Sequence, residues 1–138
     1  MRELTDQQKT LVERYTDYDL EDLYNEIGNT IAKSSNNELI QRYVLGTPNV
    51  HDRGARVVAD VRAAICAEHK RIEKIILDNQ AVLDPIDWAA TIGDVILALT
   101  LTAGIPPWSV ACALGKLCNY SLSKMCPKGT TENASKPD

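Results

Sequence analysis

The sequence predicts an all-α protein, a compact bundle of five or six helices with a central apolar helical hairpin at about residues 85–126. Apolar residues recur at three- and four-residue steps along much of the chain, which places them on one face of successive helices. Clusters of serine, asparagine, glycine and proline separate these segments. The stretch from Trp88 to Cys118 carries only two charged residues, Asp94 and Lys116, so we expect it to form the core.

Composition and charge indicate one globular domain. Of the 138 residues, 44% are hydrophobic and 25% are charged, which is close to the average of folded proteins. The net charge of −4 argues against a nucleic-acid partner, because such proteins normally carry a basic excess. We expect a single helical domain over residues 1–126. Residues 127–138 lack apolar anchors and are expected to form a disordered tail.

Capping patterns delimit the first three expected helices. Thr5 and Gln8 form a capping box before the first helix. The second helix, within residues 17–33, has acidic residues in its first turns, which complements the helix dipole. Ser35 and Glu38 form another capping box, and Gly46 is a natural stop for the helix that follows. The residues that this third helix is expected to bury are Leu39, Ile40, Tyr43 and Val44.

The longest helix is expected at about residues 52–78. Its apolar residues occupy heptad positions over less than three heptads, which favours a bundle helix over a coiled coil. This helix also carries a basic face, interrupted by acidic residues and without interleaved aromatic residues for base stacking. We therefore interpret that face as solvated. Its members are Arg53, Arg56, Arg62, Lys70 and Lys74.

Prolines delimit the last two expected helices. Asp84 can cap the fifth helix, whose first position suits Pro85 and which should end near residue 104. A turn at residues 105–107 then leads into a sixth helix from Trp108, which Pro127 must terminate.

The apolar hairpin has a membrane alternative. Residues 86–105 are long enough to cross a bilayer. Asp94 near their middle costs about 2.5–3.5 kcal/mol, which offsets most of what the Ile, Leu and Val residues supply. Polar residues also line one side of this helix, as in a core helix with one edge at water. We therefore favour a buried core. That polar stripe comprises Asp87, Thr91, Asp94 and Thr102.

The cysteines are expected to be inert. The N-terminus lacks an apolar signal segment, so we expect a cytoplasmic protein in which Cys66, Cys112, Cys118 and Cys126 are reduced thiols. Cys66 and His69 are a weak metal-ligand pair, because a tetrahedral site needs two more ligands and the chain has no CxxC motif. We expect neither a metal nor another cofactor.

The sequence contains no catalytic constellation, which favours a non-enzymatic interaction or regulatory protein of adaptor, accessory or immunity type. Its partner would be another protein or a second copy, contacted through helix faces. One alternative is a membrane-active protein whose Trp88–Cys118 hairpin inserts into or docks on a bilayer. Another is a binder of an apolar cation between helices; no small-molecule substrate is identified. The candidate contact residues are Trp88, Trp108, Asp94, Glu68, Leu97 and Leu101.

Overall fold

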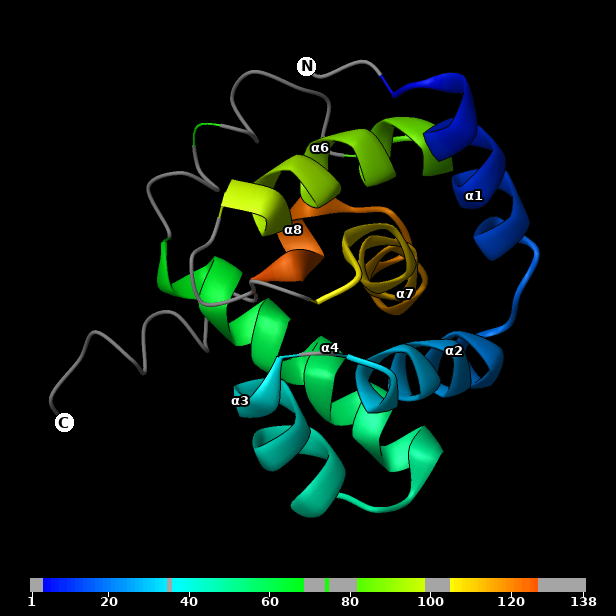
Figure 1. Cartoon of the computed structure of the whole chain (residues 1–138). Coiled ribbons are helices and arrows are strands. Elements are labelled where there is room, and N and C mark those ends of the chain that lie inside the picture. Colours follow the sequence, from blue (N-terminus) through cyan, green and yellow to red (C-terminus); the bar gives the residue numbers. More distant parts are fainter. Residues whose placement is uncertain (1–3, 35, 69–73, 75–81, 99–104, 127–138) are drawn as a thin grey trace, which may run out of the picture.

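The computed structural model describes residues 4–34, 36–68, 74, 82–98 and 105–126. These residues form helices that pack against one another in a compact bundle, which confirms the all-α prediction (Figure 1). In chain order the helices are α1 (Asp6–Thr16), α2 (Leu20–Ala32), α3 (Asn37–Leu39), the π-helix η1 (Ile40–Leu45), α4 (Val50–Ala67), α6 (Pro85–Ala98), α7 (Pro107–Cys118) and α8 (Leu122–Met125).

Helix α7 lies at the centre of the bundle, where α1, α2, α4 and α6 surround it (Figure 1). Its residues are buried from Ser109 to Gly115. Helix α6 packs along α7, and the fully buried Trp88 donates its indole N–H to the carbonyl oxygen of Ala111 at 2.8 Å. The apolar stretch of the sequence is therefore the core. No helix among the described residues is both long enough and apolar enough to cross a bilayer.

Two of the three expected caps are confirmed. Thr5 and Gln8 exchange the two hydrogen bonds of a capping box, and Asp84 accepts from the backbone N–H of Asp87 at 2.8 Å. For the third, Asn36 is the N-cap of α3, and the expected cap Ser35 lies outside the described residues. The Asn36 side chain accepts from the backbone N–H of Glu38 at 3.0 Å.

The expected sixth helix is broken in two. Asn119 and Tyr120 adopt left-handed backbone conformations, with φ of 50° and 56°, so α7 ends and α8 begins separately. The Tyr120 N–H donates to the carbonyl of Gly115 at 2.8 Å, as in a Schellman helix end. The Tyr120 ring then meets Trp88 edge to face, with ring centroids 6.0 Å apart. The packing of Tyr120 against Trp88 accounts for this break, which the sequence does not mark with a proline or a glycine.

Helix α4 is shorter than expected and ends at Ala67, with Glu68 as its C-cap. Val58, Val61 and Ile65 are buried as predicted. Lys74 is helical and exposed, whereas the other expected helix residues from His69 to Asp78 lie outside the described residues.

Two glycines let α2 and α4 approach closely. A Cβ on Gly28 would overlap the carbonyl of Val50, and a Cβ on Gly54 would overlap the carbonyl of Tyr24. Beside this contact, Arg53 is buried and donates to the carbonyls of Thr47, Pro48 and Gly28 at 2.8–3.1 Å. Arg53 therefore belongs to the α2–α4 contact, which corrects its placement on the solvated basic face.

Candidate functional site

Helix α4 separates two hollows. The first, the polar pocket, has a volume of about 430 Å³, and the second, the apolar groove, about 340 Å³. Both volumes fall within the range of ligand sites in proteins. The polar pocket is lined by Arg42, Tyr43, Arg56, Asp60, Val61, Ala63, Ala64 and Ile105. The apolar groove is lined by Tyr24, Ala55, Val58, Ala59, Arg62, Ala63, Cys66, Leu117 and Met125.

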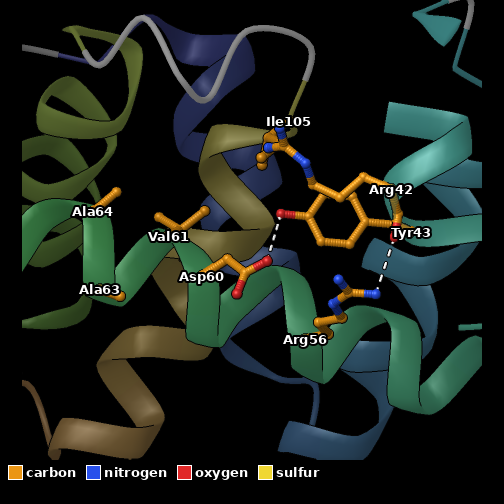
Figure 2. Close-up of a pocket in the computed structure, with 8 residues that line it drawn as sticks. All are labelled: Arg42, Tyr43, Arg56, Asp60, Val61, Ala63, Ala64 and Ile105. Atoms are coloured by element: carbon orange, nitrogen blue, oxygen red, sulfur yellow. Dashed lines mark hydrogen bonds between the residues drawn. The ribbon is translucent and has the colours of Figure 1, made fainter. Parts of the chain in front are cut away.

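A tyrosine–aspartate pair lies in the polar pocket. The Tyr43 hydroxyl, on η1, donates to the carboxylate of Asp60, on α4, at 2.8 Å (Figure 2). Burial, and then the hydrogen bond and negative charge of Asp60, raise the pKa of Tyr43 to about 12. Tyr43 is therefore a neutral donor at physiological pH, and it fixes the position of the carboxylate.

Two arginines flank this pair. Arg56 Nη1 donates to the carbonyl of Arg42 and to the Thr47 hydroxyl, both at 3.0 Å, and its Cζ lies 5.5 Å from the centroid of the Tyr43 ring. The exposed Arg42 side chain extends on the other side of that ring toward Ile105 (Figure 2). Among the described residues, no carboxylate forms an ion pair with Arg42.

The π-helix η1 places Arg42 and Tyr43 in this pocket. Helices of this kind are rare and occur frequently at functional sites. The sequence predicted the burial of Tyr43 but gave no indication of a π-helix, because six residues are too few for the apolar spacing to distinguish a π-helix from an α-helix. The pairing of Tyr43 with Asp60 could not be foreseen either, since 17 residues separate them in the chain.

The apolar groove has a floor of small side chains. Ala55, Ala59 and Ala63 recur at four-residue steps along α4, and Ala59 and Ala63 are exposed. Leu117 from α7 and Met125 from α8 contribute to the walls, and 40% of the surface of Leu117 is exposed. Among the residues that the structure describes, Arg62 is the one charged residue that lines the groove. The alanine spacing is visible in the sequence, although nothing there shows that this face is open.

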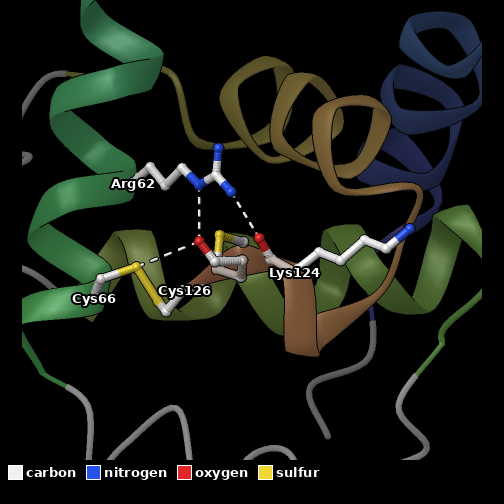
Figure 3. Close-up of a disulfide and its surroundings, with 5 residues drawn as sticks. Arg62, Cys66, Lys124 and Cys126 are labelled. Carbon is white, nitrogen blue, oxygen red and sulfur yellow. Dashed lines mark hydrogen bonds between the residues drawn. A yellow bond between two sulfur atoms is a disulfide. The ribbon is translucent and has the colours of Figure 1, made fainter. Parts of the chain in front are cut away.

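A disulfide closes one end of the groove. Cys66 on α4 is bonded to Cys126 after α8, with a Cα–Cα distance of 5.5 Å. One turn before Cys66, Arg62 donates to the carbonyls of Lys124 and Met125 at 2.6 and 2.7 Å (Figure 3). The bond and the two hydrogen bonds hold α8 against α4.

The disulfide corrects two expectations. Cys66 and Cys126 are not reduced thiols, and Cys66 cannot serve as a thiolate metal ligand while its sulfur is bonded to another sulfur. Cys112 and Cys118 are free and buried, as expected for inert thiols, and burial raises the pKa of Cys112 to about 12. Within the part of the chain that the structure describes, no cluster of His, Cys, Asp and Glu could hold a metal ion.

The contact residues suggested by the sequence lie in different environments, some of them buried and others exposed. Trp88 is fully buried and unavailable to a partner, which corrects that assignment. Trp108 is half-buried, whereas 51% of Leu97 is exposed. Glu68 and Asp94 are exposed, and neither lines the polar pocket or the apolar groove. The remaining candidates, Leu101, His69 and Lys70, lie outside the described residues.

Comparison of the chain with models of known protein families, with curated proteins and with solved structures found no match.

Proposed function

We propose that this protein is a non-enzymatic interaction domain that binds an amphipathic helix of a partner protein in the apolar groove. The open alanine ridge of α4, beside the exposed Leu117, carries this proposal. Small side chains at four-residue steps let a second helix approach closely, since the distance between packed helices depends on the side chains at their contact. A groove with apolar walls suits the apolar face of such a helix.

Charge favours an acidic border on the partner helix. Arg62 is half-buried in the groove, its hydrogen bonds go to carbonyl groups, and no carboxylate among the described residues forms an ion pair with it. Lys124 is exposed next to Met125, at the same end. Within the described part of the chain, no acidic residue lines the groove. A helix with an apolar stripe beside Asp or Glu residues would complement both features.

Site-specific crosslinking tests the proposal. A photoreactive amino acid at Ala59 should link to one partner protein in the cells that express the chain, and sequencing of the adduct should identify an amphipathic helix with an acidic border. The same amino acid at Lys9, on α1 and outside the groove, is the matched control. Leu117→Asp should abolish the adduct at Ala59.

Two outcomes would contradict the proposal. Adducts at Ala59 that match those at Lys9 would show that the groove is not a specific surface. A dimer in light scattering that Leu117→Asp converts to a monomer would assign the groove to a second copy instead.

The membrane alternative has less support, because the apolar residues of α6 and α7 that suggested it are mostly buried inside the bundle.

The disulfide indicates the kind of compartment in which the protein occurs. Disulfides persist in oxidising surroundings and are rare in the cytosol, so we propose an oxidising compartment in place of the cytoplasmic location expected from the sequence. Alkylation of intact cells before lysis should leave Cys66 and Cys126 unmodified.

A further inference from the structure

We propose that the polar pocket binds a small zwitterion with an apolar side chain, of the class of free apolar α-amino acids. This site lies on the other side of α4 from the partner groove and does not depend on that function.

The charges in the pocket favour a ligand that carries both signs. The Arg42 guanidinium has no ion-pair partner among the described residues, so it can receive a carboxylate. Asp60 accepts the Tyr43 hydroxyl through one oxygen, Oδ2, and its carboxylate can accept further hydrogen bonds from an ammonium group. A simple anion would face the Asp60 carboxylate, and a simple cation would face Arg42 and Arg56. A ligand with adjacent carboxylate and ammonium groups would be attracted both by the arginines and by Asp60.

The remaining lining residues provide an apolar surface. Val61 lies next to Asp60 on α4, Ile105 lies beside the end of the Arg42 side chain, and Ala64 continues the lining along α4 (Figure 2). No further charged residue among the described residues lines the pocket. The volume of about 430 Å³ leaves room for a side chain beyond the two charged groups. Apolar contact would then add affinity that glycine, with the same charges, could not obtain.

Tyr43 holds the Asp60 carboxylate in position, and Arg56 holds the backbone at Arg42. Tyr43 is 1% exposed and directs its hydroxyl at Asp60, while Arg56 joins the η1 backbone at Arg42 to α4. The carboxylate and the Arg42 backbone are thereby positioned before a ligand arrives, which lowers the entropic cost of binding.

Titration calorimetry on the full chain with three matched probes tests the proposal. L-Phenylalanine carries both charges, 3-phenylpropionate lacks the ammonium, and 2-phenylethylamine lacks the carboxylate. We expect L-phenylalanine to bind at least about tenfold more tightly than either analogue, since each lost charge contact is worth about 1.4 kcal/mol or more. Glycine should give no measurable heat at the same concentrations.

Two substitutions test which residue binds which charged group of the ligand. Arg42→Gln should make the affinities for L-phenylalanine and 2-phenylethylamine equal, because it removes the attraction of the carboxylate and also the repulsion between Arg42 and a lone ammonium. Asp60→Asn keeps an oxygen that can accept the Tyr43 hydroxyl, and it should make L-phenylalanine and 3-phenylpropionate equivalent. Lys9→Gln and Glu21→Gln, at exposed positions on α1 and α2, are the controls and should not change binding.

The proposal fails if no probe binds at millimolar concentration, or if either analogue binds as tightly as L-phenylalanine. It also fails if Arg42→Gln or Asp60→Asn, with an unchanged helical circular dichroism spectrum, retains full affinity for L-phenylalanine. Leu117→Asp should leave this binding intact, so failure of the partner groove and failure of this pocket give different results.

Discussion

At the scale of single residues, the burial of Tyr43 and its hydrogen bond to Asp60 make stability depend on pH in the alkaline range. The fold raises the pKa of Tyr43 from 10.0 to about 12, so it favours the neutral phenol. This contribution is fully present below pH 10 and is lost as the pH rises through 12. Tyr43→Phe should cost about 1–2 kcal/mol at pH 7, because it removes the donor to Asp60.

Urea unfolding at pH 7 and at several values between 10 and 12 would measure both effects of this substitution. Tyr43→Phe should lose less stability than the native chain over the alkaline range. Parallel stability curves for the two proteins would show that Tyr43 does not carry this pH dependence.

Thr91 is a buried residue whose hydrogen-bonding capacity is not fully used among the described residues. It is 9% exposed, and its hydroxyl has no hydrogen-bond partner among the described residues, although the sequence placed it on a stripe that faces water. Thr91→Val should therefore be neutral or stabilise the protein by about 1 kcal/mol, because it removes an unpaired buried polar group of nearly the same shape.

Thr16→Val is the matched control, since the Thr16 hydroxyl donates to the carbonyl of Val12 at 2.7 Å. Its thermal midpoint should fall while that of Thr91→Val does not. If both midpoints fall equally, the Thr91 hydroxyl has a partner in solution.

At the scale of elements, the contact between α2 and α4 depends on Gly54. Gly54→Ala places a methyl group on the backbone carbonyl of Tyr24, which cannot move without separating the two helices. We expect a loss of about 3 kcal/mol or more, at the upper end of overpacking costs. Asn29→Ala, at an exposed position of α2, should change stability by less than about 0.5 kcal/mol. Denaturant unfolding of both variants is the test, and equal midpoints would contradict it.

The elements also show where sequence reasoning succeeds. Local patterns placed the caps at Thr5 and Asp84 and the buried face of α4, because each depends on residues within one or two turns. They could not place the break at Tyr120, which depends on contact with Trp88, 32 positions earlier in the chain. Nor could they show that the close approach of a neighbouring helix requires Gly28.

At the scale of the whole molecule, the disulfide is the largest feature that the sequence reasoning missed. We expected reduced thiols from the sequence, and spacing alone does not pair cysteines that are 60 residues apart. The candidate sites were missed for a related reason. Each joins residues from several helices, and only the packed bundle brings α4 beside η1 on one side and α7 and α8 on the other.

The double variant Cys66→Ser with Cys126→Ser should lower stability by about 4 kcal/mol, from the entropy that a closed loop of this length removes from the unfolded chain. Denaturant unfolding of the double variant and the native chain measures the difference. Cys112→Ala with Cys118→Ala keeps the disulfide and serves as the comparison. The native chain should expose two titratable thiols on unfolding without reductant, and four thiols would contradict the pairing.

The position of the disulfide also determines what a protease can do to the molecule. Helices α6, α7 and α8 lie within the covalent loop that Cys66 and Cys126 close. A single cut between these cysteines therefore yields two polypeptides that still migrate as one molecule until a reductant is added. A cut before Cys66 releases everything on its N-terminal side from covalent attachment, and only non-covalent packing then keeps α1 and α2 on the bundle.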